Sequence, residues 1–201
     1  FNHVTLADAF RIEKVPATLS IDDVVVNEND GTATFYVNYH GPANSGFTVD
    51  YSVDSSTAMS VSDFTALPDT LTFTGTANEV QTITVSIVDN NIVELDELFY
   101  VNLSNLQTTD SIEIFDSQAV GTIVDNDSAE LSIGSISVDE DAGTVLVAVT
   151  LDNAVDTAVS VYYATANNTA IAGDDYTAVS ETLNFAGTAN ETHTISVSIL
   201  D

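Results

Sequence analysis

The sequence repeats itself, without a gap, at a constant offset of about 112 residues. The five residues Gly-Thr-Ala-Asn-Glu at 75–79, for example, recur unchanged at 187–191. Solenoid repeats have periods of roughly 20–50 residues, so an offset this long indicates separate domains in a row. We therefore predict one domain over 17–127 and a second, related domain over 129–201.

Each repeat has the pattern of short β-strands. Apolar and polar residues alternate over 32–39, 47–53 and 82–88, and the stretches between them are rich in Gly, Asn, Asp and Ser. The tripeptide Asn-Asp-Gly at 29–31 predicts a turn of the hairpin type. No segment has helical periodicity. About seven strands in a repeat of this length predict an all-β protein built of tandem immunoglobulin-like antiparallel β-sandwiches.

The two ends of the chain depart from the repeat. The second copy stops at Asp201, where the first copy has Asp89, so the second sandwich is expected to be incomplete at its C-terminal end, lacking its last two strands. We expect either a fragment of a longer protein or a domain completed by another chain. Residues 1–16 match no later segment and could be a linker, the tail of a preceding domain or a donor strand.

The charge is strongly one-sided. The chain has 31 acidic and two basic residues, Arg11 and Lys14, so 15–201 contains no Lys or Arg. Nucleic acid and anionic membranes are therefore excluded as partners. Such a chain needs salt or bound cations to offset its charge, which predicts an extracellular or cell-surface location; a solvated acidic surface of the halophile type is the alternative. No apolar run approaches the roughly 20 residues of a membrane-spanning helix, and there is no cysteine.

The densest acidic stretch lies within 83–99. It begins as an alternating apolar strand and then breaks into a turn with four carboxylates and no basic residue nearby. Carboxylates this close together repel one another unless a cation binds among them. Side chains that offer oxygen atoms as ligands favour Ca²⁺ as that cation. Zinc and copper sites would need Cys or clustered His, and the three histidines are scattered. Each acid taken singly could equally be a turn residue or a strand-end cap. The polar residues of the turn are Asp89, Asn90, Asn91, Glu94, Asp96 and Glu97.

Short motifs occur in the same order in both repeats. In the first repeat they are Val-Asn-Glu at 26–28, Tyr51, Thr-Ala at 57–58, Asp-Phe at 63–64, Thr-Leu-Thr-Phe at 70–73, Ile-Val-Asp-Asn at 87–90, and Gly-Thr-Ile-Val-Asp-Asn-Asp at 121–127. The second repeat has Tyr163, Thr-Ala at 169–170 and Gly-Asp-Asp-Tyr at 173–176. This ordered set resembles the Calx-beta domain family over nearly everything after Pro16.

The resemblance implies β-sandwiches that bind Ca²⁺ at one end, and it implies a ligand set. In the first repeat the implied ligands are Glu28, Asp63, Asp89, Asn90, Glu94, Glu97, Asp125, Asn126 and Asp127. In the second repeat they are Glu140, Asp175 and Asp201, about half a site. Members with tight sites often carry Asp where this chain has Asn90 and Asn126. An amide offers an oxygen without charge, so we expect lower affinity or fewer ions.

The sequence favours a structural or binding role over an enzyme. There is no nucleophile-elbow motif and no Trp to stack on sugars, and the acids recur in each repeat. We expect a calcium-binding structural repeat module of a secreted adhesin or filament protein, with Ca²⁺ rigidifying the domain junction. The alternatives are a regulatory Ca²⁺ sensor and a filament subunit completed by strand donation. The expected partners are neighbouring domains of the same or an adjacent chain and an extracellular surface ligand.

Overall fold

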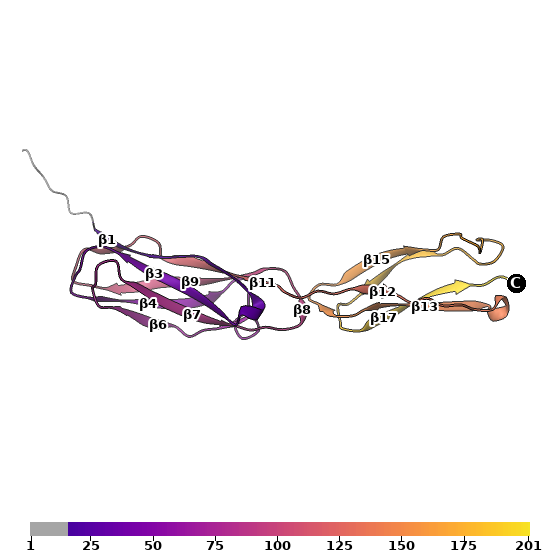
Figure 1. Cartoon of the computed structure of the whole chain (residues 1–201), viewed down its shortest axis with the longest axis horizontal. Helices are drawn as coiled ribbons and strands as arrows, with labels where there is room; N and C mark the ends of the chain where they lie inside the picture. The colour runs from indigo at the N-terminus through magenta and orange to yellow at the C-terminus, as the bar shows by residue number, and fades with distance from the viewer. Residues whose placement is uncertain (1–15) are drawn as a thin grey trace, which may run out of the picture. The chain divides into compact units, whose positions relative to one another are not determined.

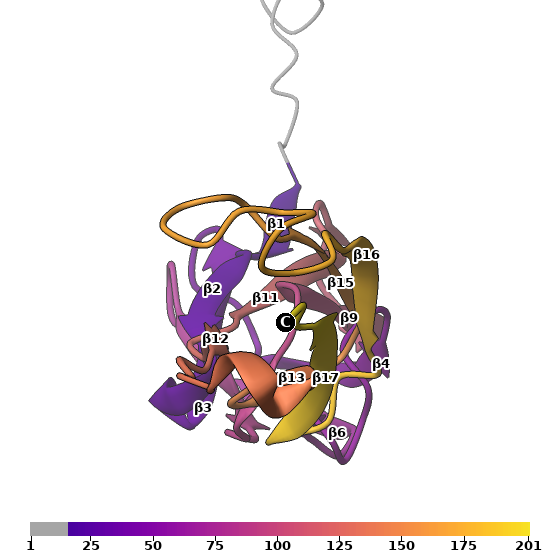
Figure 2. The same ribbon diagram turned by 90° about the vertical axis from the view of Figure 1, so that its right-hand side faces the viewer.

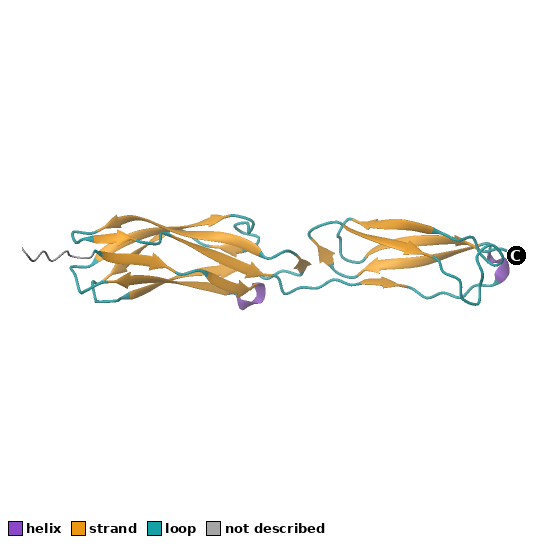
Figure 3. Ribbon diagram, turned by 90° about the horizontal axis from the view of Figure 1, so that it is seen from above, coloured by secondary structure: helices purple, strands orange, loops and turns teal. Residues whose placement is uncertain are grey.

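Residues 16–201 are described by the computed structural model, and they are almost entirely strand and loop (Figure 3). The helical segments of this part are two 3₁₀ turns, η2 (Glu28–Asp30) and η3 (Glu140–Ala142), and neither could cross a membrane. Figure 1 labels most of the strands. They are β1 (Ala17–Ile21), β2 (Val24–Asn27), β3 (Thr32–His40), β4 (Phe47–Ser55), β5 (Phe64–Thr65), β6 (Asp69–Phe73), β7 (Val80–Ile87), β8 (Ile92–Val93), β9 (Glu97–Gln107), β10 (Ile112–Ile114), β11 (Gln118–Val124), β12 (Leu131–Ile133), β13 (Thr144–Leu151), β14 (Ala154–Val155), β15 (Val159–Ala164), β16 (Ser180–Phe185) and β17 (Glu191–Ser198).

By their contacts, the residues form two compact units. Among the described residues, the first comprises 16–88 and Glu97–Val124, and the second comprises Asp89–Asp96 and Asp125–Asp201. The acidic turn at Asp89–Asp96 thus groups with the second unit, where β8 pairs in parallel with β14. The domain boundaries expected from the repeat, at 127 and 129, stay a prediction.

The first unit is a β-sandwich. One sheet has the strand order β10-β1-β3-β7-β5, and the other has the order β2-β11-β9-β4-β6. Most neighbours are antiparallel, while β1 pairs with β10 and β2 pairs with β11 in parallel. The tandem sandwich architecture predicted from the sequence is confirmed.

The alternating sequence decides which face of each strand is buried. In β3, every second residue faces the core: Ala33, Phe35, Val37 and Tyr39 are at most 1% exposed. Their neighbours in sequence point outward, as expected from the two-residue period of a strand. Because β7 alternates in the same way, the two strands bury one common face of the sheet.

Phe99 of β9 lies at the centre of the first core. Its ring stacks on Phe64 at a centroid distance of 4.8 Å and meets Phe35 edge-on at 5.7 Å. Gly121 of β11 leaves room for this ring, since a Cβ there would collide with it. Aromatic pairs of this kind contribute beyond their buried area. Phe99 therefore ties together both sheets of the sandwich.

The second unit reproduces the first at the same offset. Its sheets are β12-β13-β17 and β15-β16, and β13 and β17 lie side by side in Figure 2. β13 begins at Thr144 and β15 at Val159, which are the positions of Thr32 and Phe47 in the first repeat. The expected absence of two C-terminal strands stays a prediction.

The turn at 29–31 is not a hairpin, so that prediction is wrong. β2 and β3 belong to different sheets, and the chain crosses between them through η2. Gly31 follows with φ of 74°, the left-handed conformation that glycine adopts without strain. The donor strand predicted within 1–16 lies outside the described residues, apart from Pro16.

Candidate metal centre

Three carboxylates of the candidate ligand set converge. Glu28, Asp125 and Asp127 each offer an oxygen atom, and these atoms all lie within 4.8 Å of one another. Strand pairing explains the approach, because β2 and β11 run in parallel and Asn27 is the partner of Val124. Glu28 directly follows β2, and Asp125 directly follows β11. Two residues that are about 97 positions apart are therefore brought together by backbone pairing.

The 3₁₀ turn that follows β2 holds Glu28. The Asn27 N–H donates a hydrogen bond of 2.7 Å to the Asp30 carboxylate, which closes the turn. Glu28 is only 4% exposed, although it is an acid. Buried carboxylates normally need a charged partner or a metal ion. Asp30, which is absent from the expected ligand set, thus has a positioning role.

Asp125 and Asp127 leave β11 on the same side. The Asp127 N–H donates to Asp125 Oδ1 at 3.3 Å, which curls the chain and brings both carboxylates together. Asp127 Oδ2 is buried and has no hydrogen-bond partner within residues 16–201. A desolvated carboxylate oxygen without a donor is costly, and a cation would compensate this cost. No Lys or Arg occurs in 15–201 to do so.

Asp63 lies close to Asp89 in the backbone hydrogen-bond pattern. The Asp63 carbonyl accepts a hydrogen bond from the Val88 N–H at 2.9 Å, one residue before Asp89. Asp63 is 8% exposed, and its Oδ2 accepts the Met59 N–H at 2.5 Å. One oxygen of Asp63 thus closes its own loop, as a turn residue does. Asp89 is exposed.

The rest of the acidic turn is organised by Asn90. Its Nδ2 donates to Glu94 Oε2 at 2.8 Å, and its Oδ1 accepts the Ile92 N–H at 2.6 Å. Glu94 and Glu97 are half-buried. Within residues 16–201, the only three acidic or histidine side chains that meet within 4.8 Å are Glu28, Asp125 and Asp127. The carboxylates of the acidic turn are therefore outside this cluster, and Asn126, between Asp125 and Asp127, is exposed.

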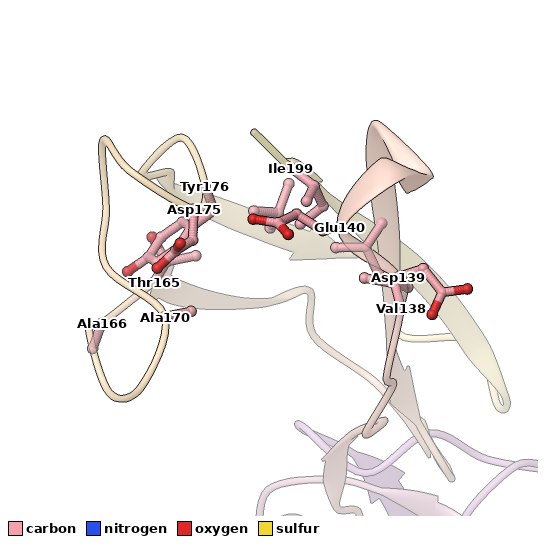
Figure 4. A pocket seen from close by; sticks show the side chains of 11 residues that line it. Val138, Asp139, Glu140, Thr165, Ala166, Ala170, Asp175, Tyr176 and Ile199 are labelled. Atoms are coloured by element: carbon pink, nitrogen blue, oxygen red, sulfur yellow. The ribbon is translucent and has the colours of Figure 1, made fainter. Parts of the chain in front are cut away.

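In the second unit, Glu140 and Asp175 line one cavity of about 470 Å³. Figure 4 shows them on opposite sides of it, Glu140 beside Val138 and Asp175 beside Tyr176. Asp175 Oδ2 accepts the Ile171 N–H at 2.6 Å, repeating the role of Asp63. Asp201 is exposed, and these three acids do not meet within 4.8 Å.

Some acids of the repeat are turn caps instead of ligand candidates. Glu191 accepts hydrogen bonds from the N–H groups of Ala186, Gly187 and Thr188, and it lies 2.9 Å from His193 Nε2. These bonds, that of the Ala186 N–H foremost, lower the pKa of Glu191 to about 2. Glu79 caps the same turn in the first repeat. This role explains the recurrence of Gly-Thr-Ala-Asn-Glu without a metal.

The family comparison agrees with the fold. The Calx-beta domain matches residues 14–127 and 124–201, so this chain belongs to the Calx-beta domain family. Sodium/calcium exchanger 2 of Homo sapiens is 30% identical over 164 residues, covering 73% of this chain and 18% of the exchanger. The same exchanger of Rattus norvegicus is 30% identical over 150 residues, covering 66% of this chain and 16% of that protein. The chain thus spans less than a fifth of these relatives.

Solved structures show the same fold. The apo form of the Calx CBD1 domain is 23% identical with a TM-score of 0.51, covering 56% of this chain and 100% of that chain. CBD12 from CALX1.2 is 22% identical with a TM-score of 0.50, covering 92% of this chain and 75% of that chain. The latter likeness extends over both units, which agrees with a tandem of sandwiches.

The expected extracellular or cell-surface location is wrong. The relatives are sodium/calcium exchangers, and the matching Calx domains are cytoplasmic in those proteins. The excess of acidic residues indicates that the chain needs salt or bound cations to offset its charge. It does not indicate on which side of a membrane those cations are found, so the location could not be inferred from composition. The Ca²⁺ expected as the bound ion agrees with the Calx domains, which bind calcium.

Proposed function

We propose that this chain is a regulatory Ca²⁺-binding module, and that Glu28, Asp125 and Asp127 hold a Ca²⁺ ion. The observation that carries the proposal is the approach of their carboxylate oxygens to within 4.8 Å. With three negative charges and no basic side chain in 15–201, this group is suited to a divalent cation.

The chemistry of the donors supports calcium over other metals. Ca²⁺ takes six to eight oxygen ligands, and Mg²⁺ prefers fewer protein ligands and more water. Glu28 and one oxygen of Asp127 are buried, which places donors where water does not compete freely. Loops at this end of the sandwich would add further oxygen ligands. The candidates are Asp63 and Asp89, because the Asp63 carbonyl accepts a hydrogen bond from the N–H of Val88, the residue before Asp89.

A sensor role is favoured over a structural one. The curated relatives are sodium/calcium exchangers, whose own function depends on calcium, and none of the comparisons supports an adhesin or a filament. In this role, ion binding would hold the Asp125–Asp127 segment against Glu28, where the pairing of β2 with β11 already places it. The chain would act by binding and shape change and not by catalysis.

Calorimetry of the purified chain tests the proposal. Sensor sites have dissociation constants of about 10⁻⁷ to 10⁻⁵ M, whereas extracellular modules bind at about 10⁻⁴ to 10⁻³ M. We expect binding in the sensor range, and at least tenfold weaker binding in Glu28→Gln. The matched control is Glu113→Gln, which removes an exposed acid from β10. Absence of binding at millimolar Ca²⁺ would refute the proposal, and a millimolar constant would refute the sensor role.

A further inference from the structure

Three large apolar side chains are exposed on one connection of the first unit, between β4 and β6. Met59, Val61 and Leu67 are 58%, 76% and 82% exposed, and we call them the apolar loop surface. Val61 and Leu67 also line a surface hollow of about 480 Å³. A single exposed apolar residue is ordinary, but apolar residues gathered around a hollow are typical of a binding surface.

Val61 has a backbone conformation that its own side chain disfavours. Its φ is 86°, in the left-handed region, where a β-branched residue is an outlier. The second repeat has Gly173 at this position, with a φ of 95°. In the first unit the Val61 N–H donates a hydrogen bond of 2.8 Å to the Phe64 carbonyl. In the second, the Gly173 N–H donates to the Tyr176 carbonyl at the same distance. This loop therefore suits glycine, and folding does not explain the valine.

The second repeat shows that the loop forms without these exposed side chains. Gly173 has no side chain at the position of Val61. Val179, at the position of Leu67, packs against the second core. Ile171, at the position of Met59, is 40% exposed, which is less than Met59 itself. Exposure of all three apolar side chains is thus particular to the first repeat and needs a reason other than the shape of the loop.

The loop holds its apolar side chains on a fixed backbone. Asp63 Oδ2 accepts the Met59 N–H at 2.5 Å, and the Asp63 N–H donates to the Met59 carbonyl at 3.0 Å. Phe64, the residue after Asp63, is 1% exposed and stacks on Phe99 in the core. A surface fixed in this way loses little conformational freedom when a partner binds, which favours affinity.

The charge of the chain indicates which partner fits. Asp54 and Asp69, both exposed, flank the loop in the sequence, and no Lys or Arg occurs in 15–201. Positive charge must therefore come from the partner. Residues 15–201 of a second copy would bring more acids, and a lipid surface would meet a domain without basic anchors. The partner that complements this surface is a polypeptide segment with both apolar and basic side chains.

We propose that the apolar loop surface binds a short polypeptide segment that is both apolar and basic. An apolar side chain of the segment occupies the hollow lined by Val61 and Leu67, and its Lys or Arg side chains lie beside the acidic residues that flank the loop. A buried apolar anchor supplies most of the affinity in such an interface, while the charges supply orientation and fast association. Met59, Val61 and Leu67 carry no oxygen ligands in their side chains, so the proposal does not depend on the calcium site.

The peptide Lys-Lys-Leu-Phe-Leu-Lys-Lys, labelled with a fluorophore, tests the proposal on the full 201-residue chain by fluorescence anisotropy. We expect saturable binding, and binding weaker by about tenfold or more for a peptide with Ser in place of Leu and Phe. The same difference should remain in the presence of a calcium chelator. No binding at millimolar peptide would overturn the proposal, and so would equal binding of the two peptides, which charge alone would explain.

Variants of the chain locate the surface. Val61→Gly gives the first repeat the residue of the second, and it should weaken binding about fivefold or more without lowering the melting temperature. Leu67→Ser should weaken binding to a similar extent. The matched control is Leu95→Ser, because Leu95 is 81% exposed but lies in the acidic turn at 89–96. This control should leave binding unchanged. Equal effects of Leu67→Ser and Leu95→Ser would contradict the assigned surface, as would a fall in the melting temperature of Val61→Gly.

Two further measurements test for other occupants. Sedimentation of the chain without peptide should give a monomer, and phosphatidylcholine vesicles should not bind it. A dimer that Val61→Gly dissociates would show that a second copy covers the apolar loop surface. Vesicle binding that Val61→Gly abolishes would show that lipid does. Either result would overturn the proposal.

Discussion

Replacing Phe99 by alanine should destabilise the first unit more than almost any other single change in it. The side chain is fully buried and contacts two aromatic rings, at centroid distances of 4.8 Å and 5.7 Å. Truncating a buried phenylalanine to alanine lowers the free energy of unfolding by about 3–5 kcal/mol. Each aromatic pair contributes about 0.5–1.5 kcal/mol. We expect a loss near the upper end, about 4–5 kcal/mol.

The loss can be measured by native-state hydrogen exchange of the β3 and β7 amides, which report on the first unit. Total stabilities of domains are about 5–15 kcal/mol, so the variant should still fold but exchange much faster. Phe115→Ala is the control, because Phe115 is 82% exposed and its removal should cost less than about 0.5 kcal/mol. A loss below about 1.5 kcal/mol for Phe99→Ala would refute the assignment of this ring as the centre of the core.

Three further predictions concern calcium and pH. At a free Ca²⁺ concentration of 100 times the dissociation constant, the ion should stabilise the chain by about 2.7 kcal/mol, and Glu28→Gln should lose most of the resulting rise in melting temperature. Asn90→Asp adds a charge beside Glu94, so calorimetry should show tighter binding or a further ion in that turn, and unchanged binding would exclude a role for this position. The pKa of Glu191 is lowered to about 2 from an ordinary value of 4.5, so its carboxylate stabilises the folded state above about pH 4.5, and this contribution is lost as pH falls towards 2. Glu191→Gln should reduce the loss of stability between pH 4.5 and 2 in acid titrations followed by circular dichroism, and identical curves would contradict this role.

Local patterns in the sequence predicted the sandwiches well. Alternation in β3 and β7 identified the buried faces, and the repeat placed β13 and β15 at the positions of β3 and β4. These features depend on the two-residue period of a strand, which is visible in any short window. The turn at 29–31 was misjudged because a tripeptide does not show whether the strands around it share a sheet.

The candidate site was less accessible to sequence reasoning. The sequence emphasised the acidic turn with Glu94 and Glu97, whereas the carboxylates that converge are Glu28, Asp125 and Asp127. Their approach depends on the parallel pairing of β2 with β11, a long-range contact that no local pattern encodes. The grouping of Asp89–Asp96 with the second unit is non-local in the same way.

The location of the bound ion tests the calcium site most directly. Crystals of the chain grown with Ca²⁺ should give an anomalous difference peak within about 2.3–2.6 Å of carboxylate oxygens of Glu28, Asp125 and Asp127. The same measurement on Asp127→Asn should show a weaker peak or none. Calcium peaks found only at other acidic residues, with this cluster empty at millimolar Ca²⁺, would contradict the account.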